Sequence, residues 1–373
     1  MSTLHTPRYP HLALLDWPFR ILPVRGNTTV WAGRRELESQ VKRLIRQLGR
    51  NSVSSLHLMW ADFGAGKTHT LYYVEPLAKE HSLFPVYVEW PKKTTTFLDV
   101  YRGIANHFSL RVLSQLFWKC CEHKGVDEVL DSVSRNFPDF GAVLERIYEN
   151  NETPLIHEWL RAQPGVGRRE LATIGIRNSI KTSDDAVRSV VVLVNLVAGS
   201  GDYVKLLLML DEFQRIDHLP PRIRRDVNTG IRTMLNACPD SLSIILSFSF
   251  GRPDNIGFLL TDEVRSLADP ESIHLPQMTK VEAMEFVEDL LSSYRSSESV
   301  EPLFPFTAES CQAILDNAGK LTPRRIMKRF NVVLRRADED IEGGVIAHVT
   351  PEYAVQILRE VPALEEEEGK EEG

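Results

Sequence analysis

Eight consecutive residues near the start of the chain have the types and spacing that bind phosphate. Residues 61–68 have the sequence A-D-F-G-A-G-K-T, which matches the spacing A-x-x-x-x-G-K-T of a phosphate-binding loop, or P-loop. Gly64 and Gly66 let the backbone turn so that successive N–H groups point at phosphate oxygens. Lys67 would reach the β- and γ-phosphates, and the Thr68 hydroxyl would bind Mg²⁺. The motif predicts that the chain binds a nucleoside triphosphate.

The segments on either side of this loop are those that a P-loop needs. The apolar residues 56–60 predict a strand before it, and residues 68–79 predict a helix after it. A chance glycine-rich turn, the alternative, would need neither. The helix N-terminus adds partial positive charge beneath the phosphates, and Ala61 replaces the usual glycine, a change that the turn can accept. The residues predicted to bind the nucleotide here are Asp62, Phe63, Gly64, Ala65, Gly66, Lys67, Thr68 and His69.

A second group of reactive side chains follows a strongly apolar run. Residues 205–210 are followed directly by Asp211 and Glu212, as when a buried parallel strand delivers acids to its carboxyl edge. In a P-loop protein this is the Walker B element. Asp211 would hold the Mg²⁺, and Glu212 would orient and polarise the attacking water. The alternative is a pair of solvated loop acids.

Hydrophobic periodicity places these residues in an α/β fold with five strands. Strands are expected at residues 55–60, 86–90, 205–210, 242–250 and 272–275. Residues 97–203 instead have a helical pattern with breaks near 136–138, 153–154 and 163–165, so they form an insertion. Other helices are expected at 33–49, 68–79, 222–237, 255–267, 279–294, 307–317, 323–336 and 351–359. Thr322 and Pro323 are a favourable helix start, with the threonine as cap.

These elements suggest a division of the chain into four parts. We expect an N-terminal arm at 1–30, packed against the core because its aromatic residues need burial. A P-loop core follows at 31–277, with the helical insertion at about 97–203. A helical lid occupies 278–360. The acidic tail at 361–373 is expected to be disordered.

Composition excludes several classes of protein. The 373 residues are 43% apolar and 25% charged, which is ordinary for a globular protein. Six glutamates and one lysine in residues 365–373 account for −5 of the net charge of −7, leaving about −2 for the rest. The four cysteines lack metal-ligand spacing, and no signal sequence or membrane-length apolar run is present. We therefore expect a cytoplasmic protein without membrane contacts.

Four stretches together resemble the AAA+ ATPase superfamily, in particular the branch of origin-recognition-type initiators and STAND-like ATPases. WAGRRELESQV resembles the F-x-G-R-x-x-E-L motif of that branch, and LLLMLDEFQRI its Walker B element. VRSLADPESIHLPQMTKVEAMEFV is similar to the passage from arginine finger into lid, and LTPRRIMKRF to the sensor-2 helix. This likeness covers roughly residues 30–337. A weaker likeness, in WLRAQPGVGRRELATIGI within the insertion, is to ATP-binding proteins of BREX-type phage-defence systems.

The resemblance implies roles for further residues. Arg34 would lie at the nucleotide, and Arg265 would be an arginine finger that completes the site of a neighbouring copy. Sensor 2 would be Arg324 or Arg325. Sensor 1 would be Ser247 or Ser249. The asparagine or threonine usual at sensor 1 is missing, and Arg252 could take its place. The sequence also departs from the initiators in lacking, after the lid, the winged helix that they use on DNA.

Basic residues gather in three places. Residues 320–336 hold seven, with no acid, and could either contact DNA phosphates or form a solvated helix face. The second group is Arg222, Arg224, Arg225 and Arg232, and the third is Arg161, Arg168, Arg169, Arg177 and Lys181. No interleaved aromatic residues indicate a single-strand platform.

Two functions follow from this sequence. The first is an ATPase that uses Mg-ATP to drive homo-oligomer assembly in a DNA-associated defence or mobile-element complex, with backbone contacts to duplex DNA. The second is a nucleotide-gated scaffold that recruits a protein partner through the insertion without binding DNA. A small-molecule kinase is disfavoured, because such an enzyme has no need of the lid helices.

Overall fold

The structure is a computed structural model that describes the chain except for residues 1–6, 26–29, 94–95, 250–257, 298 and 362–373. The chain divides into two compact units. The first contains Met1–Val41, Ala61–Tyr73 and Leu275–Gly373, and the second contains Lys42–Trp60 and Val74–His274. Each unit has its own hydrophobic core. Arg252 and the acidic residues of the predicted tail lie outside the described residues.

The second unit is built on a five-stranded parallel sheet, as the sequence predicts. Its strands are β1 (Ser55–Ala61), β2 (Leu83–Glu89), β3 (Lys205–Asp211), β4 (Leu242–Phe248) and β5 (Ile273–Leu275). They lie in the order β2-β3-β4-β1-β5. β3 pairs in parallel with both β2 and β4, and β4 pairs in parallel with β1. β2 begins three residues before its predicted start, because Leu83 already pairs with Lys205.

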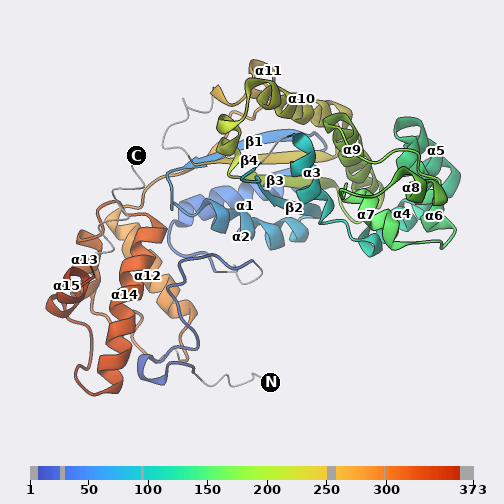
Figure 1. Ribbon diagram of the computed structural model, residues 1–373. Helices are drawn as coiled ribbons and strands as arrows, with labels where there is room; N and C mark the ends of the chain where they lie inside the picture. The colour runs from blue at the N-terminus through green and yellow to red at the C-terminus, as the bar shows by residue number, and fades with distance from the viewer. Residues whose placement is uncertain (1–6, 26–29, 94–95, 250–257, 298, 362–373) are drawn as a thin grey trace. The chain divides into compact units, whose positions relative to one another are not determined.

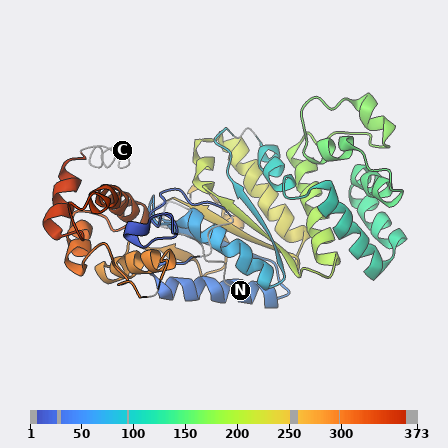
Figure 2. The ribbon, with the colours of Figure 1, turned by 90° about the horizontal axis from the view of Figure 1, so that it is seen from below.

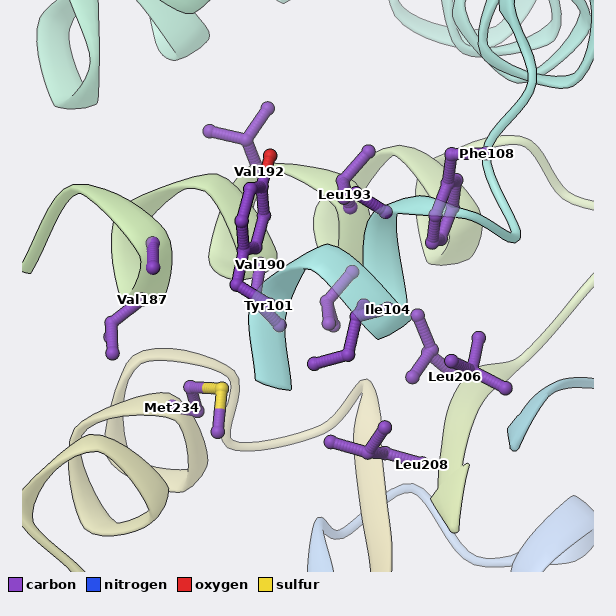
Figure 3. Packing of buried hydrophobic residues seen from close by; sticks show 14 of the residues in the cluster. Tyr101, Ile104, Phe108, Val187, Val190, Val192, Leu193, Leu206, Leu208 and Met234 are labelled. Atoms are coloured by element: carbon purple, nitrogen blue, oxygen red, sulfur yellow. The ribbon is translucent and has the colours of Figure 1, made fainter. Parts of the chain in front are cut away.

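Helices cover both faces of this sheet, so every residue of β3 and β4 is buried. On one face lie α3 (Phe97–Ala105), α9 (Ser183–Gly199) and α10 (Pro221–Ala237). Figure 3 shows Ile104 of α3 and Met234 of α10 pointing toward Leu208 of β3. The C-terminal halves of α1 (Arg35–Arg50) and α2 (Lys67–Glu80) lie along the other face (Figures 1 and 2).

The predicted insertion, all of whose residues 97–203 are described, consists of helices joined by loops and contains no strand. Between α3 and α9 it contains α4 (Leu110–Lys124), α5 (Val126–Asn136), α6 (Pro138–Tyr148), α7 (Pro154–Leu160) and α8 (Arg168–Thr173). Figure 1 shows these helices grouped beyond the end of α9, away from the sheet. Prolines begin α6 and α7, where a missing N–H costs no helical hydrogen bond. The predicted helix breaks are therefore confirmed.

The first unit contains four lid helices in the predicted order. They are α12 (Lys280–Ser293), α13 (Ala308–Asp316), α14 (Pro323–Glu342) and α15 (Pro351–Arg359). α14 runs six residues beyond its predicted end, past the buried Ala337. Thr322 does occupy the cap position of α14, but its side chain makes no capping hydrogen bond, so that detail of the prediction is wrong.

The N-terminal arm packs against the lid helices. It contains the short helix η1 (Pro10–Leu12). Trp17 donates from Nε1 to Oδ1 of Asn331 on α14, 2.7 Å away. The ring of Phe19 lies 5.3 Å from that of Phe330, between centroids. Phe19 is buried but Leu22 is 72% exposed, so the arm is only partly buried. The contacts of Trp17 and Phe19 are with the lid helices, whereas packing against the core was expected.

Two further short elements lie in the described part of the second unit. η2 (Phe213–His218) follows β3, and α11 (Asp262–Arg265) precedes β5. The helix predicted at 255–267 is shorter in its described part, because the extended backbone of Thr261 marks the start of α11. Among the described residues, none of the helices is long and apolar enough to cross a membrane.

Candidate nucleotide-binding and hydrolysis site

The P-loop belongs to the first unit and connects β1 to α2. Ala61 is the last residue of β1, and Lys67 is the first of α2. Gly64 and Gly66 have φ angles of +78° and +101°, in the left-handed region that strains any residue with a side chain. A Cβ on Gly64 would also lie only 3.1 Å from Cβ of Arg324. Both glycines are therefore required by the fold of the loop.

Lys67 is held inside this turn. Its side chain is buried, and Nζ donates to the backbone oxygens of Ala61 at 3.4 Å and Asp62 at 3.3 Å. An ammonium has three donors and forms shorter, stronger bonds with anionic oxygens than with neutral carbonyls. The cation is thus positioned inside the loop where a phosphate would be its better partner.

The first turn of α14 contacts the P-loop directly. The backbone N–H of Arg324 donates to the carbonyl oxygen of Gly64 at 3.2 Å. The Arg324 guanidinium lies over the ring of Phe63, 4.3 Å from its centroid. Nη1 of Arg325 instead lies toward Gly319, 3.5 Å from the position of a Cβ there. Of the two arginines left open for sensor 2, Arg324 is the one at the loop.

Arg34 supports the P-loop from the side of the arm. Its guanidinium is buried and donates from Nη1 to the carbonyl of Ala65 at 2.8 Å and from Nη2 to the carbonyl of Pro276. Burial lowers the pKa of Arg34 to about 10, against the raising effect of Glu282. Both described contacts are with backbone carbonyls, so Arg34 fixes the loop. That it touches the nucleotide stays a prediction.

Trp31 packs against two aromatic side chains of α2, those of His69 and Tyr73. The Trp31 ring lies 4.9 Å from that of Tyr73 and 6.4 Å from that of His69, between centroids. Burial lowers the pKa of His69 to about 4, so its imidazole is neutral near pH 7. Among the residues that the structure describes, the buried Trp31 Nε1 atom has no hydrogen-bond partner.

A polar hollow of about 440 Å³ begins at Trp31, within the same unit. It is lined by Trp31, Gly33, Arg35, Glu38, Asp289, Ser292 and Ser293. The backbone N–H of Gly33 donates to Oδ2 of Asp289 at 2.8 Å, which joins the arm to α12. Sequence analysis missed α12 here, because no local signal connects residues 31–38 with a helix 250 residues later.

The carboxylates belong to the second unit, at the carboxyl edge of the sheet. Asp211, the last residue of β3, is buried. Its carboxylate accepts from Oη of Tyr87 at 3.1 Å, from Oγ of Ser247 at 2.8 Å and from the N–H of Glu212. Tyr87 lies on β2 and Ser247 on β4. The strands on both sides of β3 therefore hold the two carboxylate oxygens of Asp211. The alternative of two solvated loop acids is wrong for Asp211.

Glu212 is held by Ser249, one of the two serines predicted for sensor 1, and by Gln214, which the sequence did not indicate. Its φ of +56° is unusual for a residue with a side chain and marks local strain. Oε2 accepts from Nε2 of Gln214 at 2.8 Å, and Oε1 accepts from Oγ of Ser249 at 3.3 Å. Gln214 also accepts from the backbone N–H of Ser249 at 3.0 Å. Ser249 and Gln214 therefore orient the predicted catalytic base together.

Arg265 lies on the surface of the same unit. Its side chain is 53% exposed and pairs with Asp262 of the same short helix. Exposed pairs of this kind contribute little to stability, so the guanidinium is free to contact another molecule at small cost. That Arg265 completes the nucleotide site of a neighbouring copy remains a prediction.

The basic clusters differ from their expected form. In residues 320–336, Arg329 is buried and Arg336 lies 3.3 Å from Glu339 and 3.5 Å from Asp340. Fewer charges face outward there than the count of seven suggests. On α10, Arg222 and Arg225 are both exposed at i, i+3 spacing, which places them on one helix face.

Comparison with known proteins identifies the chain's relatives. The family model described as BREX system ATP-binding protein BrxC/D matches residues 119–349, which include the stretch that resembles such proteins. No curated protein matches the sequence.

Two solved structures of an ORC2 protein show the same fold. The ORC2 protein of Aeropyrum pernix with ADPNP and ADP is 16% identical, with a TM-score of 0.54 over 92% of this chain and 70% of that one. Its ADP form is also 16% identical, with a TM-score of 0.53 over 92% of this chain and 72% of that one. Cdc6p of Pyrobaculum aerophilum is 17% identical, with a TM-score of 0.47 over 92% and 70%. The predicted likeness to the AAA+ origin-recognition branch is confirmed as a likeness of fold.

The family match begins within α4 of the insertion and ends just before α15, so it covers more than half of the 373 residues. The chain belongs to the family of BREX system ATP-binding proteins BrxC/D.

Proposed function

We propose that the chain binds ATP at its P-loop and hydrolyses it to ADP and phosphate, with Mg²⁺ as cofactor. The description of its family as ATP-binding supports the choice of nucleotide. The observation that carries the proposal is the loop itself, in which two glycines have positive φ angles and the Lys67 ammonium lies inside the turn. Phosphates bind such a loop through backbone N–H groups of residues 64–68 and the N-terminal end of α2.

The polar hollow beside Trp31 would take the nucleoside end of ATP. Trp31 packs on His69, the residue directly after Thr68, so the hollow lies next to the phosphate end of the loop. Its lining combines an aromatic ring, an arginine and carboxylates with two serines. Such a lining can stack on a base and hydrogen-bond a ribose.

The residues fit the predicted Mg²⁺ in chemical type. Mg²⁺ takes oxygen ligands and uses only one or two from protein, with water and phosphate oxygens as the rest. The Asp211 carboxylate, at the last residue of β3, supplies oxygen ligands of this kind. The Thr68 hydroxyl would be the other protein ligand. When bound, Mg²⁺ would neutralise phosphate charge.

Glu212 would act as the base for the attacking water. Ser249 and Gln214 hold one oxygen each, so the carboxylate is oriented before substrate arrives. An oriented base contributes roughly 10²–10⁴ in rate. We propose that turnover is slow in a single copy, because Arg265 would act on the site of a neighbour.

We further propose that the protein assembles into a homo-oligomer in a DNA-associated antiviral complex in the cytoplasm. Membership of a BREX system family supports this context. Contacts to duplex DNA would be to its phosphates. Arg222 and Arg225 on α10 are the exposed candidates, whereas much of α14 is buried or paired with acids.

The trans role of Arg265 can be tested by the dependence of turnover on protein concentration. Wild-type turnover should rise steeply with concentration, and Arg265→Ala should reduce it by roughly 10³-fold or more. Arg188→Ala is a matched control, because Arg188 is 55% exposed and pairs with Asp184 one helical turn away. Turnover independent of concentration, or equal effects of the two substitutions, would refute the trans role.

DNA binding can be tested by a salt titration at fixed ATP concentration. Each phosphate contact steepens the slope of log affinity against log salt by about 0.9. The double variant Arg222→Ala/Arg225→Ala should therefore flatten that slope by up to about 2. Arg43→Ala/Arg46→Ala, which removes two exposed arginines of α1, is the control. Identical slopes in all three proteins would exclude this surface.

The alternative function is a nucleotide-gated scaffold, in which ATP binding recruits a protein partner through the insertion. The insertion is large and lies away from the sheet (Figure 1). In that case Glu212→Gln would keep the partner bound in the presence of ATP. Loss of the partner by this variant while ATP stays bound would argue against the scaffold.

A further inference from the structure

Phe63 is a half-exposed aromatic residue inside the P-loop. Its side chain is 49% exposed, although a phenyl ring usually gains from burial. The variable positions of the motif place no demand for an aromatic residue there. The ring's described contact is with the guanidinium of Arg324, 4.3 Å from the ring centroid. Phe63 therefore has a partner, and that partner is the arginine of the lid that reaches the loop.

Arg324 is fixed at both ends of its side chain. Its backbone N–H donates to the carbonyl of Gly64 at 3.2 Å. Its Cβ and Cδ lie 3.1 Å and 3.6 Å from the position of a Cβ on Gly64, so the chain of methylenes runs along the loop. At the far end the guanidinium lies over the Phe63 ring. An arginine has several freely rotating bonds, and these contacts restrict them.

The stacked guanidinium keeps its hydrogen-bonding capacity. A cation over a ring face uses its π contact and leaves the N–H groups at its edge available. In the described part of the chain, Arg324 has no carboxylate or carbonyl partner for those N–H groups. The five donors thus stand beside the loop whose backbone N–H groups would bind phosphate.

We propose that Phe63 is a positioning residue, which holds Arg324 so that its guanidinium binds the terminal phosphate of a nucleoside triphosphate. This inference rests on the proposed ATP site. Because the diphosphate lacks the terminal phosphate, Phe63 acts on the preference for ATP over ADP. Phe63 would thus help the site to select nucleoside triphosphates over diphosphates.

The test is the affinity of the full chain for ATP and for ADP, each measured by titration. Phe63→Leu keeps apolar volume but removes the ring face, and should weaken ATP binding about three- to tenfold with ADP binding unchanged. Phe63→Tyr keeps the ring face and should bind both nucleotides as wild type does. Phe258→Leu removes a more exposed phenylalanine, 80% accessible, and serves as the control.

A double-substitution cycle isolates the contact between the two side chains. In an Arg324→Ala background, Phe63→Leu should have no further effect on ATP affinity. A full effect in that background, an equal loss of ATP and ADP affinity, or tighter ATP binding by Phe63→Leu would each overturn the proposal. If wild type binds neither nucleotide, the proposed function itself fails, a result distinct from these three.

Discussion

The phosphate-binding loop and the carboxylate edge are held in different ways. Around the P-loop, the described hydrogen bonds of Lys67, Arg34 and Arg324 are all with backbone carbonyl oxygens, those of Ala61, Asp62, Gly64, Ala65 and Pro276. At the carboxylate edge, side chains hold side chains, as Tyr87 and Ser247 hold Asp211. A backbone-built loop depends on chain conformation, whereas a side-chain network depends on the identity of each member.

This difference predicts that binding and turnover can be separated by substitution. Residues of the loop should control affinity for nucleotide, because they contact phosphate in every state of the reaction. Residues of the carboxylate edge should control rate, because a base is needed only when water attacks. Each prediction below would break or sharpen that separation.

The largest effect is expected for Glu212→Gln. The amide cannot accept the proton of the attacking water, so turnover should fall by roughly 10²–10⁴. ATP affinity should change by less than about threefold, which is under 1 kcal/mol. The rate of phosphate release measures turnover, and titration with ATP measures affinity. Glu128→Gln, an exposed residue of α5, is the control; a parallel loss of affinity in Glu212→Gln would break the separation.

Lys67→Ala should have the next largest effect, and on affinity. It removes a cation that a phosphate would bind with charge-assisted hydrogen bonds. We expect ATP affinity to fall by about 100-fold, or about 3 kcal/mol. Lys79→Ala removes an exposed lysine from the same helix and should bind ATP as wild type does. Unchanged affinity in Lys67→Ala would show that the backbone of the loop is sufficient.

The sequence was informative where structure is local and silent where contacts join distant segments. The P-loop, the strand ending at Asp211 and the helix breaks at prolines follow from neighbouring residues, and the predicted sheet is confirmed. The pairing of Gln214 with Glu212 and of Arg34 with Ala65 depends on side-chain rotamers and loop conformations that no periodicity specifies. The burial of Arg329 was missed for a related reason, since helical spacing alone does not show how wide the buried face of α14 is.

The third prediction concerns the stability of the loop region against pH. Burial lowers the pKa of His69 to about 4 in the folded protein, below an unfolded value of about 6.5. Below pH 6.5 the unfolded chain therefore binds a proton that the folded chain does not, and stability falls as pH falls toward 4. Between pH 7.5 and 5.5, His69 should cost about 1 kcal/mol of unfolding free energy.

Urea unfolding of wild type and His69→Gln at these two pH values measures that contribution. The variant should lose about 1 kcal/mol less than wild type between pH 7.5 and 5.5. His218→Gln, which replaces an exposed histidine of η2, should behave as wild type. An equal pH dependence in wild type and His69→Gln would show that the imidazole is solvated, and that the aromatic group around Trp31 is open to water.

The smallest effect is expected for Gln214→Ala, which tests whether the side-chain network orients the base. Gln214 donates to Oε2 of Glu212 and accepts from the N–H of Ser249, so its removal leaves Glu212 with fewer contacts to fix its direction. A hydrogen bond to a charged group contributes about 1.5–3 kcal/mol net. Because Ser249 still holds the other oxygen of Glu212, we expect only part of this to be lost, and turnover should fall about three- to fivefold with ATP affinity unchanged. Gln115→Ala, at an exposed position of α4, is the matched control for phosphate-release assays. Faster turnover in Gln214→Ala would mean that Gln214 restrains Glu212 away from its working position, and the carboxylate edge would then be a brake on hydrolysis.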